Sequence, residues 1–483
     1  RFDDADAFAA GQANFIEFAG SATGDINDAA AEFRRSIHSI FLQDTWQPTD
    51  ALAVTLGLRY DWYTTNDTPN ESQTFIDRYG FSNQSSFNSL EIIQPRFGLT
   101  YDAGETLAGE TSFRMGAGVF SGGDPTVFFS NAFTNDSFGT ATFDNEDANC
   151  SAAELQVLDA SGNFTGVPAC ITNAVQAAAA AGTGRTDAID PNLDLPSIVR
   201  GSIGFTHFTD FGGAAGGFFD DWTVNVDLIY TANRNEYAFV DLTLTPTGEV
   251  LPDGRPQFNA VDPLLPGCNA LFNGNLGNPG FIGTTAELSN GGACDAGSDD
   301  QDILLTNVTG RGENGRSISL SAQFAKTFDY DLFNRPASWD LNIGYAYTDT
   351  TAVTASLSST ATSNFEETAT AIINSPVAAP SRFVNRHVVT LRSTFRQEFI
   401  RDMPTAFSFF VSAREGRPFS YAYDNNTPTT LFGDSDNEER NLFYVPTGPN
   451  DPLVDLSGID QTAFFDFLDR SGLSEYAGQI SPR

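Results

Sequence analysis

The sequence predicts an all-β protein: a transmembrane, antiparallel, up-and-down β-barrel with long extracellular loops. Three observations lead to this fold class. Apolar and polar residues alternate with a period of two in ten segments, the links between these segments are short and long in turn, and charged residues occupy the less apolar face. No run approaches the roughly 18 apolar residues that a membrane helix requires, so an α-helical membrane protein is excluded.

The alternation is clearest between residues 52 and 62. Leu, Val, Leu, Leu, Tyr and Trp fill the even positions there, and Ala, Thr, Gly, Arg and Asp fill the odd positions. Such a segment is a strand with one apolar face and one polar or small face. The ten candidate strands are 36–47, 52–64, 96–101, 112–119, 197–209, 222–230, 317–324, 339–348, 383–397 and 405–414.

The links between these strands alternate in length without exception. A meander with short hairpins at one end and long loops at the other is typical of outer-membrane barrels. The short links are 48–51, 102–110, 211–220, 329–337 and 399–404. The long surface loops are about 65–90, 121–196, 243–302, 351–381 and 424–483. Within the long loops, residues 174–181 and 459–473 have helical composition or spacing.

The polar face carries many charges, which a dry core cannot hold without partners. We therefore expect it to line a wet or plugged lumen, while the apolar face meets lipid. The residues predicted to face the lumen are Arg59, Asp61, Arg96, Arg114, Asp227 and Asp340.

The four tryptophans support the same orientation. Trp46, Trp222 and Trp339 stand beside short links, and Trp62 stands beside a long loop. Each lies on the apolar side of its strand, near a strand end. We expect them to form the two girdles at the lipid interfaces.

The four cysteines form two local pairs in loops rich in Gly, Asn and Asp. No Cys-x-x-Cys exists and the histidines are distant in sequence, which argues against zinc. Two disulfides, Cys150–Cys170 and Cys268–Cys294, fit the spacing better and indicate an oxidising compartment. Spacing alone does not fix connectivity, so this pairing is a hypothesis.

Charge and motifs exclude several functions. With 25 Lys and Arg against 62 Asp and Glu, the net charge is −37, so a nucleic-acid partner is not expected. No nucleophile elbow, zinc-protease motif or phosphate-binding loop occurs, so we predict that the protein is not an enzyme and has no cofactor. Two acidic clusters are weak candidates for Ca²⁺, without EF-hand spacing: Asp295, Asp299, Asp300 and Asp434, Asp436, Glu438.

Several segments resemble the barrel of TonB-dependent outer-membrane receptors, with the Oar-like branch the most similar in its long loops. They are Phe41-Leu42-Gln43-Asp44-Thr45-Trp46, Leu56-Gly57-Leu58-Arg59-Tyr60-Asp61, Gln94-Pro95-Arg96-Phe97-Gly98-Leu99-Thr100-Tyr101 and Arg382-Phe383-Val384-Asn385-Arg386-His387. The resemblance implies a bacterial outer-membrane location and import of a scarce nutrient, such as a metal chelate, an oligosaccharide or a peptide. It also implies a 22-stranded barrel, a plug domain and energisation by the TonB system.

The sequence departs from that family pattern. Ten strands are visible, no plug-like segment precedes the first strand, and the last residues lack a closing strand with a terminal aromatic residue. We therefore expect one part of a barrel domain, with the plug domain outside this sequence. Two other hypotheses stay open, a passive porin-like channel and a secreted structural or adhesive β-protein of the cell surface.

Overall fold

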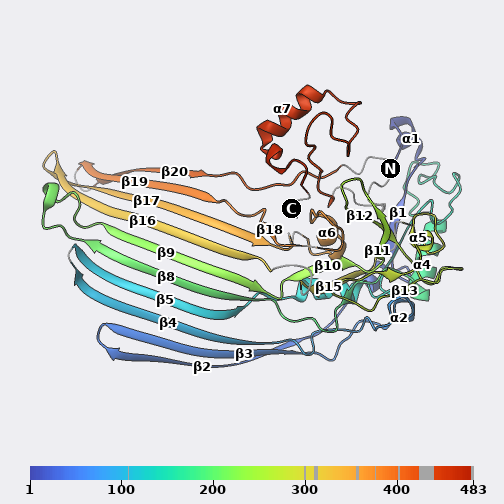
Figure 1. The fold of residues 1–483 in the computed structure, drawn as a ribbon, viewed down its shortest axis with the longest axis horizontal. Coiled ribbons are helices and arrows are strands. Elements are labelled where there is room, and N and C mark those ends of the chain that lie inside the picture. Colours follow the sequence, from blue (N-terminus) through green and yellow to red (C-terminus); the bar gives the residue numbers. More distant parts are fainter. Residues whose placement is uncertain are drawn as a thin grey trace.

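Ten long strands form one antiparallel meander in the computed structural model, which describes residues 1–106, 108–297, 301–308, 314–354, 358–375, 377–400, 403–423 and 440–479. Each strand pairs with the next along the chain (Figure 1). They are β2 (Ser36–Thr49), β3 (Leu52–Thr64), β4 (Glu91–Thr106), β5 (Gly109–Ser121), β8 (Ser197–Thr209), β9 (Thr223–Arg234), β16 (Arg316–Leu332), β17 (Arg335–Ala352), β19 (His387–Ile400) and β20 (Met403–Arg414). Each of the ten predicted segments coincides with one of these strands. A short strand, β18 (Ala379–Pro380), pairs with β17 and completes a sheet of 11 strands.

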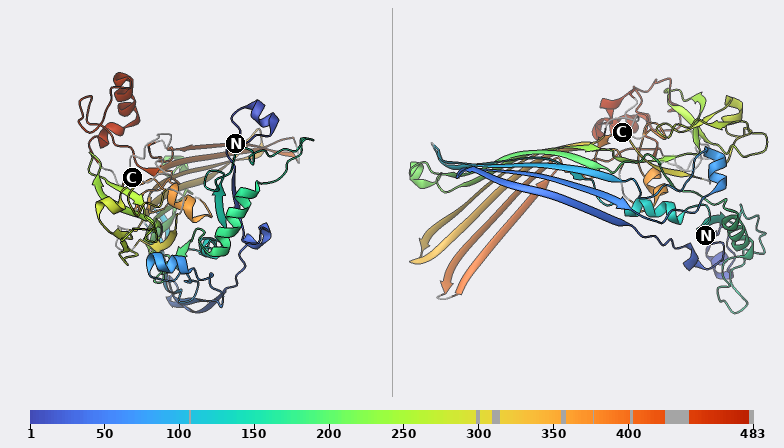
Figure 2. Two further views of the ribbon diagram at one scale, coloured as in Figure 1. Left: turned by 90° about the vertical axis from the view of Figure 1, so that its right-hand side faces the viewer. Right: turned by 90° about the horizontal axis from the view of Figure 1, so that it is seen from below.

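The sheet is curved but open, with β2 and β20 as its two edges (Figure 2). Every residue of β20 and nearly every residue of β2 is exposed. The strands contain 12 to 18 residues, more than the 9–11 that a tilted strand needs to span a bilayer. The fold is therefore that of an outer-membrane barrel sheet, not closed within the described residues.

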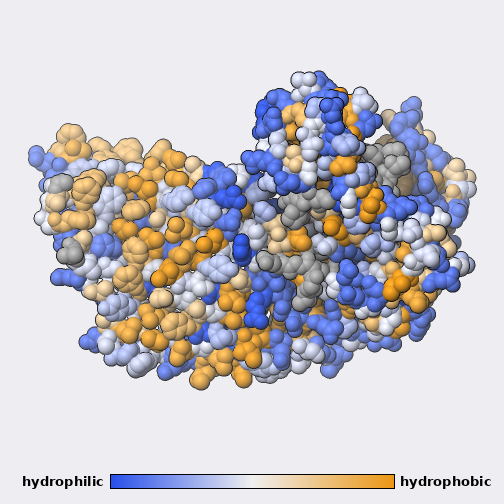
Figure 3. All heavy atoms as spheres, viewed as in Figure 1, coloured by the Kyte–Doolittle hydropathy of each residue, from blue (hydrophilic) through white to orange (hydrophobic). Residues whose placement is uncertain are grey.

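The apolar side chains of this sheet are exposed rather than packed in a core. Leu56 is 59% exposed and Ile343 is 38% exposed, while Val226 is half-buried. Figure 3 shows hydrophobic residues gathered over the long strands. An apolar sheet face that no protein layer covers is suited to lipid and unfavourable in water.

The strands extend further into the short links than the alternation predicts. Only residues 107–108, 333–334 and 401–402 separate three of the strand pairs. The long links also differ from the predicted bounds: one runs over 235–315 rather than 243–302, and another begins at 415 rather than 424. Alternation fades where a strand leaves the membrane, because both faces then meet water.

The long links fold into helices and small sheets at one end of the strands (Figure 1). The helices are α1 (Ala5–Ala10), α2 (Gln73–Tyr79), α3 (Thr126–Thr134), α4 (Ala169–Ala181), α5 (Thr285–Leu288), α6 (Ala361–Glu366), α7 (Gln461–Ser471) and the 3-10 turns η1 (Ile26–Ala29), η2 (Ala214–Gly217) and η4 (Leu473–Tyr476). Of these, η2 lies in a short link at the opposite end. The additional strands are β1 (Glu17–Gly20), β6 (Ala141–Asp144), β7 (Ala188–Ile189), β10 (Tyr237–Asp241), β11 (Leu244–Val250), β12 (Pro256–Ala260), β13 (Leu271–Phe272), β14 (Phe281–Ile282) and β15 (Ile303–Asn307).

The hydrophobic core lies in this loop region. One cluster includes Phe87, Phe129, Phe239 and Phe365. A second includes Phe75, which is 1% exposed. The loops therefore form a packed domain of their own, and its apolar burial holds the ends of the strands in place.

Both predicted disulfides are present. Cys150 and Cys170 join the start of α4 to the segment after β6, and Cys268 and Cys294 join two turns around β13, β14 and α5. Each bond closes a local loop inside the packed loop region.

None of the helices in the described residues is long and apolar enough to cross a membrane.

Candidate functional site

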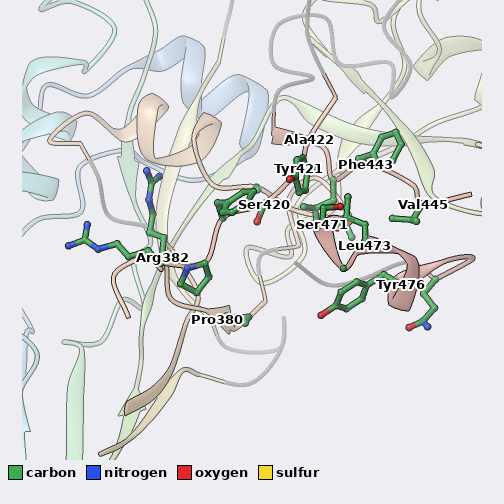
Figure 4. Close-up of a pocket in the computed structure, with 18 of the residues that line it drawn as sticks. Pro380, Arg382, Ser420, Tyr421, Ala422, Phe443, Val445, Ser471, Leu473 and Tyr476 are labelled. Carbon is green, nitrogen blue, oxygen red and sulfur yellow. The ribbon is translucent and has the colours of Figure 1, made fainter. Parts of the chain in front are cut away.

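A pocket of about 820 Å³ opens in the loop region, beside the ends of β19 and β20. Its wall comes from six separate stretches: residues 253–255, residues 367–371, the end of β18 with its link to β19, the residues after β20, residues 442–445, and the end of α7 with η4 and the residues after it. Figure 4 shows Arg382 on one side of it and Val445 and Tyr476 on the other. This volume lies within the range of small-molecule pockets.

The pocket is lined by four arginines and three carboxylates in a chain whose acidic residues outnumber its basic residues. Arg255 pairs with Asp253 at 2.7 Å, and both side chains are less than 10% exposed. Arg386 pairs at 3.1 Å with Asp349, outside the pocket wall. The exposed Arg382 has no ion-pair partner among the described residues.

Two further charged residues are open to a ligand in the same way. Arg417 and Glu367 are exposed and have no ion pair in the described part of the chain. Glu415 lies 4.0 Å from His387, at the limit of an ion pair. The pocket therefore presents both signs of charge to a ligand.

Aromatic side chains line the rest of the pocket. Phe419 is 75% exposed and stacks edge-on against Tyr421, with ring centroids 5.2 Å apart. Phe443 and Tyr476 also line the pocket. Exposed rings beside unpaired charges can contact an apolar group while the charges fix its polar ends.

A buried ion network joins three long loops elsewhere in the loop region. The Arg78 guanidinium at the end of α2 is 2.9 Å from Asp262 Oδ2 and 3.3 Å from Asp302 Oδ2. Asp302 also accepts hydrogen bonds from the Tyr79 hydroxyl at 2.8 Å and the Thr186 backbone N–H at 2.9 Å. Burial raises the pKa of Asp302, and the nearby Arg78 opposes that shift.

Other polar contacts join the remaining loops. Asn374 donates to the Asp241 backbone carbonyl at 2.6 Å and accepts from the Asp241 N–H at 2.9 Å. Arg255 donates to the Leu442 carbonyl at 2.7 Å. Because these partners come from different links, the links are packed against one another rather than folded separately.

The structure places the six residues predicted to face the lumen on the polar face of the sheet, in three groups. In the first group, Arg59 Nε donates to Asp61 at 2.8 Å, and Gln94 donates to the other Asp61 oxygen at 2.6 Å. Arg96 lies next to them, with its guanidinium carbon 4.8 Å from the Phe120 ring centroid. Gln94 shares the polar parity of β4 but was not among the predicted residues.

The other two groups are ion pairs between strands. Arg114 Nη2 lies 2.8 Å from Asp227 Oδ2. Asp340 pairs with Arg396 and accepts from Thr327 Oγ1 at 2.8 Å. Arg396 was missed because the alternation is weak in the segment that became β19.

The four tryptophans lie near strand ends. Trp222 and Trp339 belong to one aromatic cluster with Phe328 at the short-link end, with the Phe328 and Trp339 centroids 5.2 Å apart. Trp62 stacks on Tyr60 at the long-loop end, and Trp46 is 63% exposed beside the first short turn.

Of the six candidate cation ligands, one lies in the described part of the chain. Asp295 accepts hydrogen bonds from the backbone N–H groups of Gly291 and Gly297, at 2.6 and 3.1 Å, within a tight turn. Asp299, Asp300, Asp434, Asp436 and Glu438 lie outside the described residues. Among the residues that the structure describes, no three His, Cys, Asp or Glu side chains converge as a metal site.

One comparison with known proteins, a match to a family model, agrees with this architecture. Residues 3–207 match the model of an outer membrane beta barrel domain. A search of curated proteins found no match. Among solved structures, the siderophore receptor PirA from Pseudomonas aeruginosa aligns at 11% identity and a TM-score of 0.32, over 78% of this chain. This chain spans 40% of the length of that receptor.

The domain match covers the first strands of the meander, β2 to β8. The apolar side chains of these strands are exposed rather than covered by a protein layer. Together, these findings place the protein in the bacterial outer membrane. The matched domain is described as an outer membrane beta barrel.

Proposed function

We propose that the protein is a TonB-dependent outer-membrane receptor that captures a scarce nutrient at its loop face for import. The pocket at the mouth of the sheet is the main support, because it combines unpaired charges of both signs with exposed aromatic rings. A receptor needs a preformed ligand site on the extracellular side, and the pocket in the packed loop region is the candidate that supports this proposal.

The charges favour some cargo classes over others. A neutral oligosaccharide offers Arg382 and Arg417 uncharged acceptors only, whereas a peptide or a metal chelate carries acid groups that form stronger, charge-assisted hydrogen bonds. Glu367 and Glu415 disfavour a ligand with only negative charge. We therefore expect an amphoteric cargo, of which a short peptide with apolar side chains is the simplest example.

Binding and uptake by intact cells test this function. Removing Arg382 and Arg417 together as Arg382→Ala and Arg417→Ala should reduce uptake of the cargo at least tenfold, the loss of about 1.4 kcal/mol or more expected for charged hydrogen bonds. Arg470→Ala is the matched control, because Arg470 is 73% exposed on α7 and pairs only with Asp466. Equal uptake by both variants would exclude the pocket as the cargo site.

The two alternative functions make different predictions. A passive channel would conduct ions in planar bilayers and would take up solutes after the proton gradient is collapsed. An adhesive surface protein would stay in aqueous solution without detergent. Uptake that stops when the gradient is collapsed, by a protein that requires detergent, supports the receptor over both.

A further inference from the structure

The short link between β8 and β9 carries exposed aromatic rings on a glycine-rich turn. Residues 210–222 read Asp-Phe-Gly-Gly-Ala-Ala-Gly-Gly-Phe-Phe-Asp-Asp-Trp. Phe211, Phe218 and Phe219 are 49%, 51% and 52% exposed. We call residues 211–222 the aromatic foot; it forms the end of the molecule opposite the loop region (Figure 1).

The polar groups of the aromatic foot are largely satisfied inside it. The Asp220 carboxylate accepts from the backbone N–H groups of Phe211 at 2.6 Å and Gly213 at 2.9 Å. The Trp222 indole N–H donates to the Phe218 carbonyl at 2.8 Å. A turn whose backbone groups are already hydrogen-bonded can enter a less polar medium at a smaller desolvation cost.

Lys326, on β16, joins the aromatic foot to the sheet through hydrogen bonds. It is the only lysine in the sequence, and it is 8% exposed. Its ammonium group donates to the carbonyl oxygens of Gly217, Phe218 and Asp220, at 2.9, 3.1 and 2.5 Å. An ammonium group has three donors that can point to three converging acceptors, whereas the guanidinium of arginine is a planar fork.

The foot is continuous with the apolar face of the sheet. Lys326 has the same parity in β16 as Ile318, Leu320 and Phe324, which point to the apolar side. The Phe218 ring lies 5.9 Å from the Phe328 ring, which in turn stacks on Trp339. The exposed phenyl rings therefore extend a surface that already meets lipid.

We infer that the aromatic foot binds the boundary between acyl chains and headgroups in the phospholipid leaflet on the short-link side. The three hydrogen bonds from Lys326 hold the foot against the sheet in this position. The rings enter the acyl region and the acidic ends of the link stay at the headgroups. Asp210 and Asp221 flank the rings, so zwitterionic phospholipids fit this surface better than anionic ones. The foot would fix how deep the sheet sits in the membrane.

Photo-crosslinking in native outer membranes tests the inference. Phe219 is replaced by the photoreactive benzoylphenylalanine, and the adduct is identified by mass spectrometry. We expect a phospholipid adduct at position 219, as at the lipid-facing Phe324 in the middle of β16, and none at Phe164, which is 67% exposed in a loop. No lipid adduct at position 219, despite one at position 324, would overturn the proposal.

A second variant tests whether Lys326 holds the aromatic foot in place while the sheet stays folded and inserted. Lys326→Met keeps the side-chain length but removes the three donors, so the adduct yield at position 219 should fall several-fold. The yield at position 324 should stay unchanged, which shows that the sheet is still inserted. Amide hydrogen exchange over 211–221 should increase in the same variant. An unchanged adduct yield at position 219 and unchanged hydrogen exchange over 211–221 would show that Lys326 does not hold the foot in place.

Discussion

Arg114 on β5 reaches across β8 to pair with Asp227 on β9, at 2.8 Å between Nη2 and Oδ2. Gly204 lies between them in register, opposite Arg114 on one side and Asp227 on the other. A Cβ at Gly204 would lie 2.8 Å from the Val226 carbonyl oxygen and closer still to Asp227 Oδ1. The absent side chain of Gly204 thus makes the ion pair possible.

Gly204→Ala is expected to destabilise the sheet by about 1–3 kcal/mol, the usual cost of overpacking. The added methyl group would displace the Asp227 carboxylate and break the pair with Arg114. Thermal unfolding in detergent measures the change. Gly201→Ala on the same strand is the control, because a Cβ there meets nothing within 4 Å. Equal stability of both variants would show that the glycine has no such role.

The ten strands could be predicted from sequence because their cause is local. Each strand has lipid on one face and a polar lumen on the other, so a period of two appears in the segments, clearly in Leu52–Trp62 and more weakly in 383–397. Parity also placed Arg114 and Asp227 on one face. Their pairing was not predictable, since it depends on register across three strands and on the small residue between them.

The small sheets inside the loops could not be predicted, because their pattern is not local. Every residue of β10 and β15 is buried, so neither strand shows alternation. The third strand of this sheet, β7, lies more than a hundred residues earlier in the chain and pairs in parallel with β15. The pocket shares this problem: Arg382 belonged to a recognised motif, but its proximity to Arg417 and Tyr476 depends on how six separate stretches of the chain pack.

Breaking the buried ion network is expected to loosen three loops together. Arg78→Met would leave the Asp302 carboxylate, which is 1% exposed, without its cation, at a cost of about 3–5 kcal/mol. Hydrogen exchange in α2, β7 and β15, one element from each loop, should rise in concert. Arg470→Ala, in an exposed pair on α7, should change stability by less than about 1 kcal/mol. A loss confined to α2 would mean that the loops are independent.

The segment around Asp451 should weaken in acid. The backbone N–H groups of Thr447 and Leu453 lower the pKa of Asp451 to about 2 from its usual 3.8. Because the folded pKa lies below the unfolded value, the stabilisation is present above pH 3.8 and is lost as the pH falls toward about 2. Hydrogen exchange over 444–453, corrected for its intrinsic rate, should therefore increase across that range. Asp451→Asn cannot titrate and should remove this dependence; an unchanged profile in that variant would contradict the assignment.

The two disulfides should stabilise separate parts of the loop region. Cys170 begins α4 and lies beside a small cluster with Ile171 and Val175, whereas Cys294 is fully buried in the cluster around Phe75. In the chain-entropy model, each bond contributes about 3 kcal/mol; the two bonds close loops of 20 and 26 residues.

Replacing both cysteines of one pair by alanine should raise hydrogen exchange around that pair alone: in α4, β1 and β6 for the first, and in β11 to β14 for the second. Each double variant serves as the control for the other, because both lose one disulfide bond and two sulfur atoms. If either variant loosened both regions equally, the loop region would unfold as a single cooperative unit, and the local role of the bonds would be wrong.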